Sequence, residues 1–125
     1  MLLAEDNDMN REIATELLEL QGAEVIACED GKKALEEFQR SGIREYDAIL
    51  LDIRMPVMDG YEAAKAIRLM GAGERPDAAD IPIIALTASD YEEDAQKCRQ
   101  AGMDEHLPKP LDAGNLIRVI QKYLR

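Results

Sequence analysis

The sequence has little cysteine, little histidine and no long apolar run. Cys28 and Cys98 stand far apart without CxxC spacing, and the chain has one histidine. We therefore expect two reduced, buried thiols, with neither a zinc site nor a disulfide framework. No apolar stretch approaches the ~18 residues that a membrane-spanning helix needs, and the amino terminus lacks a signal-peptide pattern. We expect a soluble, cytoplasmic protein with no membrane contact by this domain.

Positive charge is also scarce. Lys and Arg number 15 against 26 Asp and Glu, which gives a net charge of −11. The phosphate backbone of a nucleic acid would be repelled unless the basic residues were gathered on one face, and no such cluster is visible. We expect no nucleic-acid partner for this domain. The 125 residues suit one domain over residues 1–125, which can also be part of a longer chain.

Strand-like and helix-like segments alternate along the chain. The expected strands cover residues 2–4, 24–28, 48–51, 81–86 and 105–107. Five strand-helix pairs in sequence predict parallel strands with right-handed crossovers and helices on both faces. The expected fold is therefore α/β: a doubly wound five-stranded parallel sheet in the order 2-1-3-4-5, flanked by five helices in the flavodoxin-like manner.

The first and last helices carry clear apolar stripes. The first stripe is Met9, Ile13, Leu17 and Leu20, and the last is Leu116, Ile117, Ile120 and Leu124. Asp8 is the expected N-cap of the first helix, and the fourth helix is expected from about Asp90 to Ala101. Residues 70–80 are rich in Gly, Ala and charge, which predicts a surface loop.

Polar residues stand where the expected strands end. Glu5 and Asp6 follow the first strand, Asp52 ends the third, Thr87 ends the fourth, and Lys109 follows the fifth. Ligands of doubly wound sheets bind at this carboxyl edge, so these side chains are expected to form one site. Three neighbouring carboxylates repel one another unless a cation joins them, and a hard ion such as Mg²⁺ (or Mn²⁺) prefers such oxygen ligands.

Asp52 is the most informative of these residues, because its charge directly follows the buried run at 48–51. An Asp carboxylate that attacks phosphorus gives an aspartyl phosphate. Catalysis of such a transfer depends mostly on positioning and on neutralising charge. Lys109 would supply a point charge and Thr87 a hydroxyl, both directed at the phosphoryl oxygens.

Several motifs occur in a specific order. They are LAEDN at 3–7, LDIRMP at 51–56, MDG at 58–60, PIIALTA at 82–88 and KP at 109–110. With these motifs the chain resembles, over essentially its whole length, the receiver domain of two-component response regulators. It is most similar to the receivers of hybrid sensor histidine kinases.

This resemblance implies a phosphorelay function. Asp52 would take a phosphoryl group from the phosphohistidine of a sensor histidine kinase or a histidine phosphotransfer protein, and the partner-binding surface would then switch. Such a domain is not an enzyme acting on other substrates, although it promotes its own phosphorylation and dephosphorylation, and a parent hybrid chain could be a histidine kinase.

The resemblance also assigns roles to single residues. Asp6, Asp52 and the backbone carbonyl of Arg54 would bind Mg²⁺, and Glu5 would hold the metal through water. Ala88 would offer its N–H to the phosphoryl group, next to the switch hydroxyl of Thr87 and the lysine of the family, Lys109. His106 occupies the switch position where the family usually has Tyr or Phe, which puts the usual aromatic switching in doubt.

Three other functions share parts of this pattern. An FMN carrier of this architecture needs amides and hydroxyls after the first strand, where Glu5 and Asp6 would repel the phosphate. A phosphatase of the haloacid dehalogenase type needs a second acid two residues after its Asp, and Arg54 stands there. The remaining alternative is a pseudo-receiver that only binds other proteins.

Overall fold

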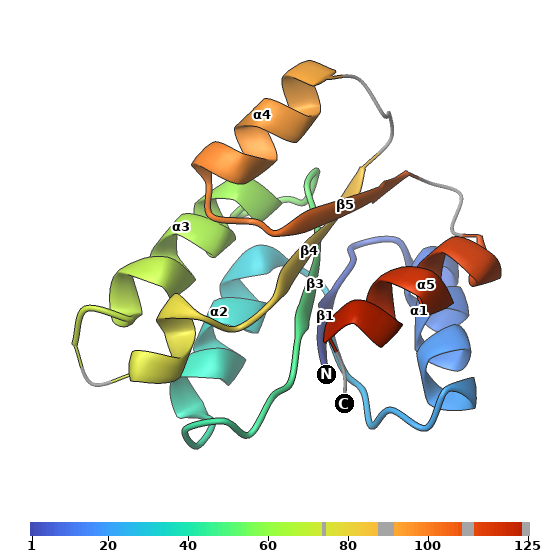
Figure 1. Ribbon diagram of the computed structural model, residues 1–125, viewed down its shortest axis with the longest axis horizontal. Coiled ribbons are helices and arrows are strands. Elements are labelled where there is room, and N and C mark those ends of the chain that lie inside the picture. Colours follow the sequence, from blue (N-terminus) through green and yellow to red (C-terminus); the bar gives the residue numbers. More distant parts are fainter. Residues whose placement is uncertain (74, 88–91, 109–111, 124–125) are drawn as a thin grey trace.

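Five parallel strands form a sheet at the centre of the molecule, and helices cover both faces of this sheet (Figure 1). The computed structural model describes residues 1–73, 75–87, 92–108 and 112–123. Its strands are β1 (Leu2–Ala4), β2 (Ile26–Cys28), β3 (Ile49–Asp52), β4 (Ile83–Thr87) and β5 (Glu105–Pro108). They pair in the order β2-β1-β3-β4-β5, which confirms the predicted sheet.

The helices are α1 (Asp8–Leu20), α2 (Gly31–Arg40), α3 (Gly60–Met70), α4 (Glu92–Gln100) and α5 (Ala113–Tyr123), with a short 3₁₀ helix, η1 (Pro76–Ala79). The expected start of α4 at Asp90 and the apolar Leu124 lie outside the described residues. No helix in the described part of the chain combines the length and apolarity that crossing a membrane requires.

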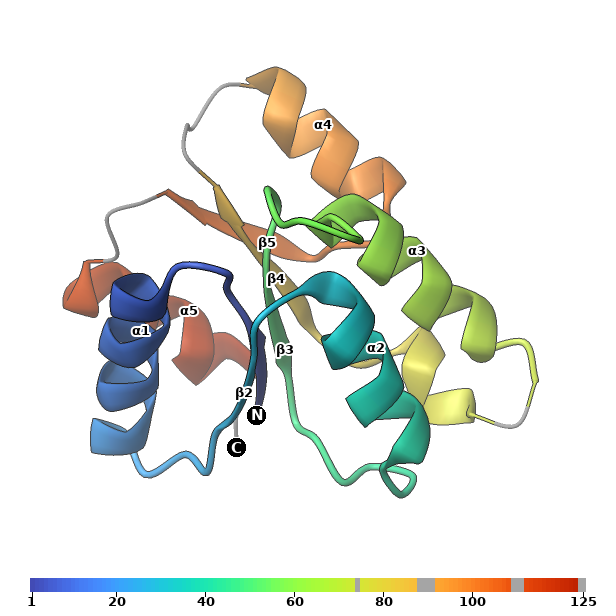
Figure 2. The same ribbon diagram turned by 180° about the vertical axis from the view of Figure 1, so that it is seen from behind.

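Two apolar layers sandwich the sheet. Helices α1 and α5 cover one face, and α2 and α3 cover the other (Figures 1 and 2). Successive residues of a strand point to opposite faces. Leu50 accordingly packs in the α1–α5 layer, while Ile49 and Leu51 pack in the α2–α3 layer. A strand covered on both faces has no polar alternation, which explains the continuous apolar runs in the sequence.

Helix α1 differs from its prediction in two respects. Its N-cap is Asn7, whose side chain accepts a hydrogen bond from the backbone N–H of Asn10, whereas Asp8 lies in the first turn. The fully buried residues of α1 are Ala14 and Leu18. The large side chains of Met9, Ile13 and Leu20 are exposed. Of the predicted stripe, only the half-buried Leu17 packs against the core. The buried face is therefore rotated from the predicted one, because a small alanine takes part in it.

The segment 70–80 was expected to be a surface loop, and this is wrong for its second half. Asp77 and Ala78 of η1 are buried. Arg75 pairs with Asp77 at 3.0 Å, and its guanidinium lies 4.3 Å from the centre of the Phe38 ring of α2. The segment is anchored by an ion pair and a cation–π contact, which an apolar sequence pattern does not reveal.

Candidate functional site

The carboxylates of Glu5, Asp6 and Asp52 meet at the carboxyl edge of the sheet. Glu5 and Asp6 directly follow β1, and Asp52 is the last residue of the neighbouring strand β3. One oxygen from each carboxylate lies within 4.8 Å of the others. The structure thus brings together the three acids that the sequence singled out.

This acidic cluster is half enclosed. Glu5 is 1% exposed and Asp52 is 4% exposed, while Asp6 is exposed to solvent. The backbone N–H of Asn7 donates to Glu5 Oε1 at 3.2 Å, and that of Arg54 donates to Asp52 Oδ1 at 3.3 Å. An all-oxygen donor set that opens to water on one side fits Mg²⁺ or Mn²⁺, which keep part of their hydration shell in proteins.

The loop after Asp52 is closely packed against its own strand. A Cβ on Gly60 would lie 2.5 Å from the backbone oxygen of Asp52, so the approach requires glycine. The N–H of Gly60 donates to Ile53 O at 2.9 Å. From α2, Gly31 lies so close to Met58 that a Cβ on residue 31 would collide with the Met58 backbone oxygen. Both contacts fix the path of the chain beside Asp52.

Thr87 and His106 lie on the two strands beyond β3. Thr87 ends β4 and is buried, one residue beyond Leu86, the register partner of Asp52. His106 is half-buried in β5 and pairs in register with Ala85. The predicted contacts of Ala88 and Lys109 lie outside the described residues, and the metal ligation by the Arg54 carbonyl stays a prediction.

Arg11 is a neighbour of this site that sequence reasoning missed. From the first turns of α1 its guanidinium reaches back to the backbone oxygen of Glu5, with Nη1 at 2.9 Å. Its Nη2 donates to the carboxylate of Asp8. An arginine shortly after three acids was the available signal, but helical periodicity alone does not show that the side chain folds back toward the strand.

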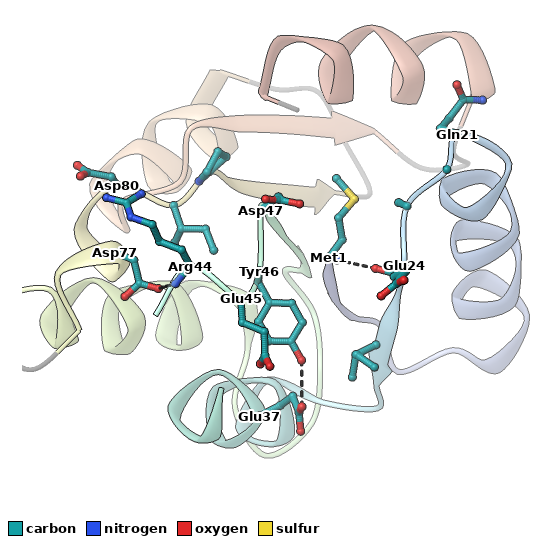
Figure 3. Close-up of a pocket in the computed structure, with 15 residues that line it drawn as sticks. Met1, Gln21, Glu24, Glu37, Arg44, Glu45, Tyr46, Asp47, Asp77 and Asp80 are labelled. Carbon is teal, nitrogen blue, oxygen red and sulfur yellow. Dashed lines mark hydrogen bonds between the residues drawn. The ribbon is translucent and has the colours of Figure 1, made fainter. Parts of the chain in front are cut away.

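A separate hollow of ≈ 1050 Å³ lies at the opposite edge of the sheet (Figure 3). Residues that precede the strands line it, among them Asp47 and Pro82. The hydroxyl of Tyr46 donates to Glu37 Oε1 at 2.9 Å, and burial together with this bond raises the pKa of Tyr46. Because the acidic cluster is at the carboxyl edge, this hollow is not part of the candidate site.

Comparison with known proteins points to one family. The family described as "Response regulator receiver domain" matches residues 1–121. "Hybrid signal transduction histidine kinase L" of Dictyostelium discoideum is 38% identical over 126 residues, covering 98% of this chain and 7% of that protein. The chain thus spans less than a tenth of the length of this curated relative.

Two similar solved structures carry information about ligands and partners. The receiver domain of sensor histidine kinase PA1611 from Pseudomonas aeruginosa PAO1, solved with a magnesium ion coordinated in its active site cleft, is 38% identical, with a TM-score of 0.84 and coverage of 98% of this chain and 93% of that one. The other is a co-crystal structure of the histidine phosphotransfer protein Ypd1 and the receiver domain of Ssk1 from Saccharomyces cerevisiae. It matches at 27% identity and a TM-score of 0.85, covering 98% of this chain and 86% of that one.

Proposed function

The chain belongs to the response regulator receiver domain family, and from that premise we propose that it accepts a phosphoryl group on Asp52. The observation that carries the proposal is the convergence of Glu5, Asp6 and Asp52 within 4.8 Å at the carboxyl edge of the sheet. Asp52 ends a buried strand, so its carboxylate is held in one place while Asp6 keeps the site open to solvent.

The proposed donor is a phosphohistidine on a sensor histidine kinase or a histidine phosphotransfer protein. A carboxylate oxygen of Asp52 would attack phosphorus and form the O–P bond. The N–P bond of the phosphohistidine would break, and the imidazole nitrogen would keep the electron pair and take up a proton. The similarity to a hybrid histidine kinase and to a receiver crystallised with a phosphotransfer protein supports this choice of partner. Such an exchange would take place in the cytoplasm.

The residues around Asp52 would prepare the site for this transfer. Asp6, Asp52 and the carbonyl of Arg54 would hold Mg²⁺ (or Mn²⁺), with Glu5 acting through water. A cation bound there neutralises charge on the phosphoryl oxygens. Lys109, the Thr87 hydroxyl and the Ala88 N–H would bind the same oxygens, and His106 would take the switch position in β5.

The test is phosphorylation by a small donor. We expect incubation with acetyl phosphate and Mg²⁺ to add one phosphoryl group, measured by intact-protein mass spectrometry, and we expect Asp52→Ala to gain none. Asp47→Asn is the matched control, since Asp47 is an exposed acid just before the same strand. A phosphorylated Asp52→Ala protein would show that the acceptor is wrong. An unmodified wild type would favour the pseudo-receiver alternative, a module that only binds proteins.

A further inference from the structure

The guanidinium of Arg11 holds the backbone between the two acids that follow β1. We propose that Arg11 is a positioning residue: it fixes the peptide unit that joins Glu5 to Asp6, and so sets the geometry with which these acids meet a divalent cation. This inference rests on the proposed function, because it assumes that the acidic cluster binds a cation.

The contacts of the turn support this role. The carbonyl of Glu5 belongs to the peptide that links it to Asp6, and Arg11 Nη1 lies 2.9 Å from its oxygen. Because a peptide unit is planar, holding its carbonyl also restricts the Cα atoms on both sides. On the other side of Glu5, its N–H donates to Cys28 O of β2 at 3.1 Å. The two bonds together fix the backbone on either side of the Glu5 side chain.

The chemistry of arginine suits this task. The guanidinium is a planar fork, and its second nitrogen donates to the carboxylate of Asp8. The side chain of Asp8 is 92% exposed while that of Arg11 is 21% exposed. The ion pair with such an exposed carboxylate stabilises the fold very little, so its main effect is to orient the fork. A lysine would offer one donor point instead of two.

Electrostatics and positioning predict opposite effects when Arg11 is removed. A positive charge beside a cation site weakens cation binding, so removing the charge alone should strengthen Mg²⁺ binding. If Arg11 instead positions the ligands, its loss should weaken binding. Groups that orient metal ligands typically contribute 10–100-fold to metal affinity, so we expect Arg11→Met to raise the dissociation constant for Mg²⁺ by about tenfold.

The measurement is a calorimetric titration with MgCl₂ at constant ionic strength. Arg40→Met is the matched control, because Arg40 is an exposed arginine of α2 that pairs with Glu37 on the surface. We expect its affinity to stay within about twofold of wild type, since surface ion pairs have small effects. Arg11→Lys keeps the charge and should bind Mg²⁺ with intermediate affinity; it also serves as the test if Arg11→Met fails to fold.

A second measurement needs no metal. The N–H of Asn7 donates to Glu5 Oε1, so its hydrogen exchange reports on the turn that Arg11 holds. We expect faster exchange at Asn7 in Arg11→Met, with exchange in β3 unchanged. Unchanged or tighter Mg²⁺ binding in the variant would overturn the inference. Should the wild type bind no Mg²⁺, the proposed cation site is wrong, and unchanged exchange at Asn7 would then overturn the role of Arg11 separately.

Discussion

Val57, on the loop after Asp52, holds a backbone conformation that β-branched residues rarely adopt. Its φ is 70°, and the N–H of Met58 donates to Pro56 O at 2.7 Å across it. A hydrogen bond from residue i+2 to residue i around a positive φ defines the strained form of the γ-turn. The residue is 75% exposed, so burial does not offset this strain.

Replacing Val57 with glycine should therefore stabilise the fold. Glycine adopts positive φ without steric cost, although it also gives the unfolded chain more freedom. We expect Val57→Gly to raise the free energy of unfolding by about 1 kcal/mol, measured as a higher urea midpoint. Ile43→Gly is the control: Ile43 is exposed and is not among the described residues with positive φ, so this change should destabilise. A lower midpoint for Val57→Gly would mean that the turn is not strained.

At the scale of single residues, sequence predicts the side chains at the end of a strand but not those that reach back to it. Glu5, Asp6 and Asp52 were predictable because each stands at the end of an apolar run, and parallel strands bring those ends to one edge. The contact of Arg11 with Glu5 O depends on a side-chain rotamer, and the γ-turn at Val57 depends on loop packing. Neither feature produces a periodic pattern in the sequence.

Helix α2 is fastened at its carboxyl end by a segment distant in sequence. The guanidinium of Arg75 donates to the backbone oxygens of Phe38, in the last turn, and of Ser41, the C-cap residue. Carbonyl groups at a helix end lack the full set of intrahelical partners, so these bonds add to the C-terminal cap. It also donates to both carboxylate oxygens of Asp77. The side-chain hydrogen bond from Arg75 lowers the pKa of Asp77, and the hydrogen bond from the backbone N–H of Arg44 lowers it further, whereas burial raises it. We call this group of Arg75 and Asp77 the basal clasp.

The basal clasp should stabilise the fold at neutral pH and lose this effect in acid. Removing one partner of a buried ion pair typically costs 3–5 kcal/mol, so Asp77→Asn should lower the free energy of unfolding by about 3 kcal/mol at pH 7. The pKa of Asp77 in the folded protein lies below the usual 3.8. The stability that its ionised carboxylate contributes is therefore complete above about pH 3.8 and is lost as the pH falls through the folded-state pKa. The gap in the free energy of unfolding between wild type and Asp77→Asn should therefore be constant from pH 7 to about 5 and should narrow in more acidic solution.

Urea unfolding at a series of pH values measures this gap. Asp80→Asn is the control, since Asp80 is an exposed acid close to the clasp in sequence, and we expect its effect to stay small. A gap that persists unchanged to the lowest pH at which the protein folds would show that the ionised carboxylate is not what Asp77 contributes.

At the scale of elements, the errors of sequence reasoning have a common physical cause. Periodicity located α1, and the strand count gave the sheet order. Periodicity failed where packing uses a small or charged residue in place of a large apolar one. Beside Leu18, helix α1 packs the small Ala14 against the sheet, and the pair of Arg75 with Asp77 anchors the segment 70–80. Such contacts depend on the neighbouring element, which a local sequence window does not contain.

Over the whole molecule, negative charge gathers at both edges of the sheet. The net charge is −11, with Glu5, Asp6 and Asp52 close together at the carboxyl edge and further acids around the hollow at the other (Figure 3). Repulsion between like charges destabilises the compact state. A cation that binds only the folded chain should therefore act on the stability of the entire fold.

Mg²⁺ should raise the melting temperature by mass action. At ten times its dissociation constant, a ligand of the folded state adds about 1.4 kcal/mol, which corresponds to a shift of about 5 °C for a domain of this size. Asp6→Asn should melt at or above the wild-type temperature without metal, because it removes one of three crowded charges, and it should lose most of the response to Mg²⁺.

Asp47→Asn removes an equal charge at the opposite edge and should keep the full response. NaCl at matched ionic strength separates specific binding from general screening of the acidic surface. If Asp6→Asn kept the full Mg²⁺ response, the cation would have to bind elsewhere, since the exposed carboxylate of the cluster would then play no part in holding it.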